Sequence, residues 1–350
     1  MRKPAKLVPG DIIAAVSLSW GGPAIFPQRY AAGKQQLEET FGVKVVETRH
    51  ALNDADWLAR HPQARAEDLM EAFADPAIKA IVATIGGDDS IRLLPYLDRQ
   101  IVQDNPKIFL GFSDTTVTHL VCYQAGLVSF YGPSVMAGFA ENGGIFPYTI
   151  DSMRRTLFST DPIGIISPNL DGWTVEFLDW ADPSLQAQRR ALQPAGGWRW
   201  LQGNGRVQGH LLGGCLEVLD WLRGTTAWPD SAAWDQAILF LETSEEAPSP
   251  EYVTRVLRSF AAMGVLEKIA ALLFGRPGGS VSAADFKKYD QAILRVVAEE
   301  QGLTDLPIVT HMDFGHTDPM LVLPYGVRAE VNCDQRNIAI MESAVVAENR

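Results

Sequence analysis

The stretch Ile108-Phe109-Leu110-Gly111-Phe112-Ser113-Asp114-Thr115-Thr116 decides how we interpret the rest of this chain. It begins as a short apolar run, turns through Gly111 and Phe112, and continues into a helical pattern that extends to Gln124. Ser113 therefore stands at a strand-to-helix turn, near the positive end of a helix dipole and beside N–H groups that could stabilise an oxyanion. The G-x-S-x-G signature of ordinary α/β-hydrolases is absent. Two interpretations stay open: Ser113 is a nucleophile, or it N-caps the helix, which is the commoner role at this place.

Composition limits the class of protein. The chain has 350 residues, so two domains are expected, and its 47% hydrophobic and 21% charged content is typical of globular proteins. A net charge of −12 argues against nucleic acid or an anionic membrane surface as a partner. The three cysteines are far apart and form no C-x-x-C, so neither a disulfide framework nor a zinc knuckle is expected. With no apolar run of transmembrane length, we expect a soluble, cytoplasmic protein.

Strands and helices alternate through the first 130 residues. The expected strands cover residues 11–17, 43–46, 80–85 and 108–111, and the expected helices cover 27–41, 61–74 and a segment through Leu94. Such alternation predicts an α/β fold with a parallel sheet, which binds ligands at the carboxyl ends of its strands. Gly86, Gly87 and Ser113 all fall at those ends.

The alternation stops after Phe130-Tyr131-Gly132-Pro133. Residues 171–203 hold four of the nine tryptophans and show no clean period, which indicates a long ordered loop or a β-rich connector. Strand and helix patterns resume at Gly205. We therefore expect an N-terminal α/β domain over residues 1–170, a Trp-rich connector over 171–204 and a C-terminal α/β domain over 205–350.

The glycine pair in Gly86-Gly87-Asp88-Asp89-Ser90 follows an expected strand. Paired glycines let backbone N–H groups approach a ligand oxygen closely, and a following helix favours an anion. The turn also resembles the phosphate-binding turn of phosphofructokinase-like kinases. A tight turn that simply requires positive φ is an equally good explanation.

An acid and a histidine complete the candidate chemistry. Glu242 closes the wholly apolar run Ile238-Leu239-Phe240-Leu241, where a carboxylate needs partners because burying it alone is too unfavourable. It could orient a catalytic histidine, or simply begin an acidic loop. His316 lies in a Gly-flanked turn, with His311 as a nearby rival, and His119 is expected to point elsewhere. No metal-binding histidine spacing, Walker A loop or G-x-G-x-x-G occurs, so we expect neither a metal nor a cofactor.

Taken in order, these pieces resemble the serine peptidase family of LD-carboxypeptidases and microcin-immunity (MccF-like) proteins. The matching motifs extend almost from end to end: Leu7-Val8-Pro9-Gly10-Asp11, Ile85-Gly86-Gly87, Arg92-Leu93-Leu94-Pro95-Tyr96-Leu97-Asp98, Gly111-Phe112-Ser113-Asp114, Tyr131-Gly132-Pro133, Gly209-His210-Leu211-Leu212-Gly213-Gly214, Leu239-Phe240-Leu241-Glu242 and Phe314-Gly315-His316-Thr317.

The resemblance implies a flavodoxin-like N-terminal α/β domain and a C-terminal α/β domain with a cleft between them, usually as a homodimer. It implies a Ser–His–Glu triad of Ser113, His316 and Glu242. It also implies an oxyanion hole made by the backbone N–H groups of Gly87 and Asp114.

Two branches of the family predict different substrates. Cell-wall enzymes release D-alanine from diaminopimelate in peptidoglycan tetrapeptides, whereas immunity-type members hydrolyse the amide of an aminoacyl-sulfamoyl or phosphoramide adenylate. The Trp-rich segment favours the second branch, because Trp180 or Trp198 could stack on a nucleobase, although either could instead pack the domain junction. Gly86 and Gly214 are further candidates for substrate binding. A non-catalytic module that sequesters an aminoacyl nucleotide and a kinase are the remaining alternatives.

Overall fold

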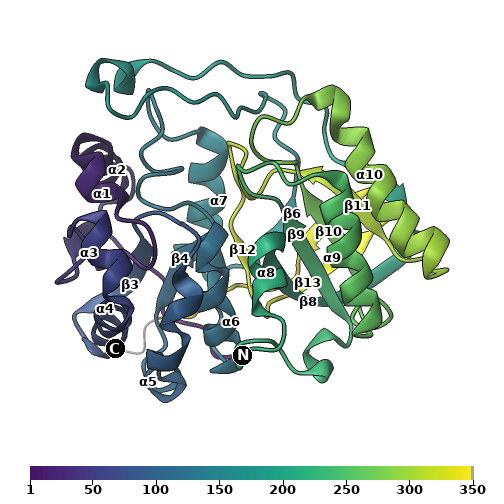
Figure 1. Cartoon of the computed structure of the whole chain (residues 1–350), viewed down its shortest axis with the longest axis horizontal. Coiled ribbons are helices and arrows are strands. Elements are labelled where there is room, and N and C mark those ends of the chain that lie inside the picture. The colour runs from purple at the N-terminus through teal and green to yellow at the C-terminus, as the bar shows by residue number, and fades with distance from the viewer. Residues whose placement is uncertain (348–350) are drawn as a thin grey trace.

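The computed structural model describes residues 1–347, and within them the strands form two sheets (Figure 1). The first sheet has the order β12 (Leu323–Pro324), β5 (Phe130–Tyr131), β4 (Ile108–Gly111), β3 (Ile78–Ala83), β1 (Ile12–Val16) and β2 (Lys44–Glu47). Strands β1 to β5 are parallel in the flavodoxin-like order 2-1-3-4-5, and β12 joins β5 antiparallel. Its helices are α1 (Gly22–Ile25), α2 (Pro27–Phe41), α3 (Ala55–Arg60), α4 (Pro62–Ala74), α5 (Arg99–Asp104), α6 (Thr116–Gln124) and α7 (Pro147–Leu157).

The second sheet has a parallel centre with antiparallel flanks. Its order is β6 (Gly164–Ile166), β14 (Asn337–Ile340), β13 (Arg328–Asn332), β8 (Arg206–Cys215), β9 (Ala237–Glu242), β10 (Ala271–Gly275), β11 (Ile308–Met312) and β7 (Arg199–Gln202). Strands β8 to β11 are parallel, which fits their largely buried, apolar sequences. The helices of this half are α8 (Leu216–Leu222), α9 (Pro250–Ala262) and α10 (Phe286–Leu294), which a π-helical segment, Arg295–Glu300, extends. The prediction of two α/β domains is confirmed.

The sheets do not follow the predicted boundaries at residues 170 and 205. Strand β6 lies before the first boundary and β7 before the second, yet both pair in the second sheet. Strand β12 lies far into the C-terminal half but extends the first sheet. Between β6 and β7 the chain forms a long loop that crosses from one half of the molecule to the other at the top of Figure 1. The Trp-rich segment is therefore mostly an ordered loop, with β-structure at its end.

The two sheets share one apolar core. Tyr131 of β5 packs on Phe240 of β9 with 5.6 Å between ring centroids, and Phe240 packs on Tyr325 at 5.1 Å. All three side chains are almost completely buried. The seam between the halves is therefore part of one buried apolar core, and strand ends from both sheets meet there.

None of the helices within residues 1–347 has the length and apolar composition needed to cross a membrane.

Candidate active site

Ser113 occupies a strained turn directly after β4. Its φ is +63°, a left-handed conformation that costs a residue with a side chain roughly 1–3 kcal/mol. Its backbone N–H donates to the hydroxyl of Tyr131 at 3.0 Å. The interpretation of Ser113 as an N-cap is wrong: the cap positions are Phe112 for the short turn Ser113–Thr115 and Thr115 for α6. The left-handed turn instead directs the Ser113 side chain toward the second half of the molecule.

A chain of hydrogen bonds connects Ser113 to the end of β9. The Oγ of Ser113 lies 3.0 Å from Nε2 of His316, and Nδ1 of that ring lies 2.6 Å from Oε2 of Glu242. The other oxygen of Glu242 accepts a hydrogen bond from the Tyr131 hydroxyl at 2.5 Å. Glu242 is completely buried, so both of its oxygens depend on these donors. The arrangement is that of a nucleophile, a base and an orienting carboxylate.

Two glycines keep space open beside the serine. A Cβ on Gly86 would lie 3.1 Å from Ser113 Oγ and 3.7 Å from the backbone nitrogen of Asp114. Gly87 has φ +150° and closely approaches Ser19, which leaves no room for a side chain. The Asp114 carboxylate points away from the serine, since it accepts from the N–H and hydroxyl of Ser90 at 2.9 and 2.7 Å.

The charge of His316 depends on two carboxylates. Burial by itself lowers the pKa of His316, but Glu242 and Glu245 outweigh this effect and raise the pKa well above the ordinary value of 6.5. Oε2 of Glu245 lies 3.0 Å from Nε2, the same nitrogen that faces Ser113. Burial and the neighbouring Glu242 raise the pKa of Tyr131, so its hydroxyl stays protonated and donates.

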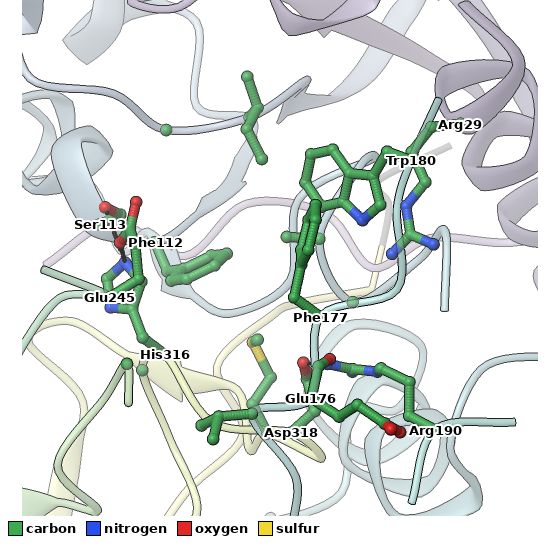
Figure 2. A pocket seen from close by; sticks show the side chains of 18 of the residues that line it. Arg29, Phe112, Ser113, Glu176, Phe177, Trp180, Arg190, Glu245, His316 and Asp318 are labelled. Atoms are coloured by element: carbon green, nitrogen blue, oxygen red, sulfur yellow. Dashed lines mark hydrogen bonds and ion pairs between the residues drawn. The ribbon is translucent and has the colours of Figure 1, made fainter. Parts of the chain in front are cut away.

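A cavity of about 490 Å³ opens in front of Ser113 and His316 (Figure 2). Its wall opposite the serine is aromatic, with Trp180 and Phe177 5.8 Å apart between ring centroids. The Arg29 guanidinium lies over the Trp180 ring at 4.8 Å. Phe177 is 68% exposed and lines the cavity together with Trp180, so the two rings offer apolar surface to a ligand.

Ion pairs hold the loop that carries this wall. Arg190 pairs with the buried carboxylate of Glu141 in the first half, and with Asp318 Oδ2 at 2.6 Å in the second. Asp318 stands two residues after His316, so the loop and the histidine turn share one anchor. Within residues 1–347, no group of His, Cys, Asp and Glu side chains is placed to hold a metal ion.

Comparison with known proteins decides the family. The profile of the LD-carboxypeptidase N-terminal domain matches residues 13–132, and that of the LD-carboxypeptidase C-terminal domain matches residues 208–331. The chain belongs to the LD-carboxypeptidase family. It is thus a hydrolase of the serine carboxypeptidase type, and the kinase interpretation of Gly86-Gly87 is wrong.

Relatives from both branches of the LD-carboxypeptidase family are similar to this chain. The Escherichia coli microcin C7 self-immunity protein MccF is 28% identical over 346 residues, 98% of this chain and 97% of its own. The Pseudomonas aeruginosa murein tetrapeptide carboxypeptidase is also 28% identical, over 90% of this chain and 92% of its own. An MccF-like protein from Streptococcus pneumoniae, solved in complex with AMP, has a TM-score of 0.85 at 33% identity and covers 95% of this chain and 99% of its own. MccF has also been solved with aspartyl sulfamoyl adenosine (TM-score 0.82, 26% identity, 99% of this chain and 100% of that chain).

The structure brings most of the predicted residues of this LD-carboxypeptidase-family site together. Gly86, Gly87, Ser113, Trp180 and His316 line the cavity, and Glu242 lies buried behind the histidine. Asp114 follows the serine, with its side chain turned toward Ser90.

Trp198 and Gly214 are not among the described residues that line the cavity. The indole N–H of Trp198 donates to Asp313 at 2.7 Å, and its ring packs against the core. Gly214 has φ +133° and lies against Thr116 at the start of α6, where a Cβ would collide. Both residues therefore pack the second half of the molecule or its seam with the first.

The rival histidines lie elsewhere. His119 is completely buried, with Nε2 2.9 Å from the Gly111 carbonyl oxygen, and burial lowers its pKa to about 3. Nε2 of His311 lies 3.3 Å from Asp290.

Sequence reasoning missed three residues of the site. Tyr131 belongs to a quoted motif, yet nothing local indicates that its hydroxyl reaches both Ser113 and Glu242. Glu245 lies in the acidic run after Glu242, and this run was the only feature of the sequence that could have indicated a role for Glu245. The double ion pair of Arg190 has no sequence signature at all.

Tyr131→Phe tests the hydroxyl that joins the two halves. We expect the free energy of unfolding to fall by about 1–3 kcal/mol, because a buried carboxylate oxygen and a backbone N–H lose their partner together. Urea unfolding measures this change. Tyr148→Phe is the matched control, since that hydroxyl donates to the Ser167 carbonyl at the surface. Equal losses in the two variants would contradict the assigned role of Tyr131.

Proposed function

We propose that this protein hydrolyses an amide bond through a triad of Ser113, His316 and Glu242. The observation that carries the proposal is the unbroken series of contacts from a strained serine through the imidazole to a buried carboxylate. Ser113 Oγ attacks the carbonyl carbon while His316 Nε2 takes its proton. His316 then protonates the departing amine, and water hydrolyses the acyl-enzyme by the same route. Glu242 holds the ring in the orientation that points Nε2 at the serine.

The proposed oxyanion hole consists of the backbone N–H groups of Gly87 and Asp114. Its support is steric, since the missing side chain of Gly86 leaves space beside Ser113 Oγ and near the Asp114 nitrogen. Backbone donors fixed around such a space stabilise the negative oxygen of a tetrahedral intermediate.

The proposed substrate is an aminoacyl-sulfamoyl or phosphoramide adenylate, and the biological role is self-immunity or detoxification. The aromatic wall supports this choice, because Trp180 and Phe177 offer flat apolar surface to a nucleobase across the cavity from the serine. The complexes of relatives with AMP and with aspartyl sulfamoyl adenosine support it too. Release of D-alanine from a murein tetrapeptide is the second candidate, favoured by the similarity to the murein enzyme. A cytoplasmic homodimer completes the proposal.

Direct assay separates the candidates. The protein is incubated with an aspartyl sulfamoyl adenosine and, separately, with a diaminopimelate-containing tetrapeptide, and the products are identified by mass spectrometry. We expect free aspartate from the first, and a rate about 10⁴- to 10⁶-fold lower for Ser113→Ala with the fold intact by circular dichroism. D-Alanine from the tetrapeptide would select the second candidate. Binding without product would indicate a sequestering module, and activity that survives in Ser113→Ala would refute the triad.

Trp180→Ala tests the aromatic wall. Since stacking on a base is worth about 1–3 kcal/mol, we expect the KM for the nucleotide substrate to rise about tenfold to a hundredfold, with a smaller change in kcat. Steady-state kinetics measure both constants. Trp221→Ala removes an indole that is 39% exposed on α8 and should leave both unchanged. An unchanged KM in Trp180→Ala would remove the support for a nucleotide substrate.

The pH dependence follows from the carboxylates around His316. The base must be neutral, so kcat/KM should rise with pH through the pKa of His316, with a midpoint above 6.5 because Glu242 and Glu245 raise it. Ser113 and, behind Glu242, Tyr131 are the other polar groups at the ring. In Glu245→Gln one negative charge is lost, so we expect an NMR titration of His316 to shift to lower pH. A midpoint at or below 6.5 in the unmodified protein would contradict this account.

A further inference from the structure

Glu245 is an exposed carboxylate at the reacting centre. Its side chain is 72% exposed and lines the cavity, yet Oε2 lies 3.0 Å from His316 Nε2. That nitrogen lies 3.0 Å from Ser113 Oγ as well. The carboxylate and the nucleophile are therefore close neighbours on one side of the imidazole, as Figure 2 shows.

The backbone around Glu245 is firmly held. Buried Glu217 accepts from the N–H and the hydroxyl of Ser244 at 2.9 and 2.5 Å. Thr243 Oγ1 accepts from the N–H of Gly278 at 3.2 Å, and a Cβ on Gly278 would collide with the carbonyls of this segment. Glu245 is thus presented to the cavity from a fixed position.

In the part of the chain that the structure describes, Glu245 is the one carboxylate that lines the cavity beside Ser113. Asp318 is paired with Arg190, and Glu176 lies beside them, across the cavity from Ser113 in Figure 2. Within residues 1–347, His316 is the one cationic side chain within ion-pair distance of Glu245. A cationic group of the substrate could therefore bind Glu245 by replacing His316 as its ion-pair partner.

The position of Glu245 relates to the chemistry of the acyl group. When the acyl carbon bonds to Ser113 Oγ, a substituent on the neighbouring carbon lies two bonds from the reacting centre. In an aminoacyl conjugate that substituent is a free ammonium group. In a longer peptide the same nitrogen forms an amide and carries no charge, so a carboxylate at this place distinguishes the two kinds of substrate.

We propose that Glu245 binds the free α-ammonium group of the acyl moiety and so selects aminoacyl substrates over N-acylated ones. The inference rests on the proposed function, whose substrate class it specifies. On binding, Glu245 exchanges its ion pair with His316 for one with the substrate. His316 then loses a partner that competes with Ser113 for Nε2 and favours the protonated ring.

The experiment compares aspartyl sulfamoyl adenosine with its Nα-acetyl derivative. We expect kcat/KM of the unmodified protein to favour the free amine by about tenfold or more, as a charge-assisted hydrogen bond would give. In Glu245→Gln this ratio should fall to near one, partly because activity on the acetylated compound rises when His316 is released. Structural damage would lower both activities and leave the ratio high. Glu246→Gln makes the same change of charge one residue further on and should keep the full ratio.

Binding to Ser113→Ala, measured by calorimetry, separates this inference from the proposed function. A preference for the free amine that disappears in Ser113→Ala/Glu245→Gln supports the inference even where turnover is too slow to measure. A ratio that is unchanged by Glu245→Gln, in a protein whose activity depends on Ser113, overturns the inference and leaves the triad intact. Activity that does not depend on Ser113 overturns the triad.

Discussion

The burial of one carboxylate constrains the whole arrangement. Glu242 is completely enclosed, and a carboxylate without partners in such surroundings would destabilise the fold by several kcal/mol. One of its oxygens accepts a hydrogen bond from Tyr131 of the first sheet, and the other pairs with His316 from the turn after β11 in the second. Both donors reach it only if β5 and β9 meet at the apolar seam where Tyr131 packs on Phe240. The burial of Glu242 therefore requires both the observed packing of the two halves and the observed position of the His316 imidazole.

Tyr131 extends this constraint to Ser113, the proposed nucleophile. Its hydroxyl accepts from the backbone of Ser113 while it donates to Glu242, so one phenol contacts both ends of the proposed triad. This contact helps to hold the left-handed conformation of Ser113, which an unsupported loop would relax. The site is thus pre-organised by packing, and the separation of the serine and the carboxylate cannot change unless the core changes.

The sequence predicted the parts of the site that lie at the ends of apolar strands. The predicted strand over 108–111 and the predicted helix over 27–41 match the structure, and the apolar run 238–241 lies within β9. Ser113 and Glu242 were found from the apolar runs that precede them. Strands β6, β7 and β12 have two to four residues, too few for a period, and their pairing depends on distant partners. Trp180 and Trp198 look alike in sequence. In the structure, the loop anchored through Arg190 places Trp180 on the cavity, whereas Trp198 donates to Asp313 and packs on the core.

The polar groups of the cavity are divided between its two ends. The far end has Trp180 with the Arg29 guanidinium over its ring, and Arg190 there is already neutralised by Glu141 and Asp318. The near end has Ser113, the proposed nucleophile, and the solvated carboxylate of Glu245. A ligand that matches both ends is cationic beside its reacting carbonyl and planar further out. The aromatic wall and Glu245 are independent features on different segments, yet both support the same proposed substrate, an amino acid joined through its carboxyl group to a nucleoside.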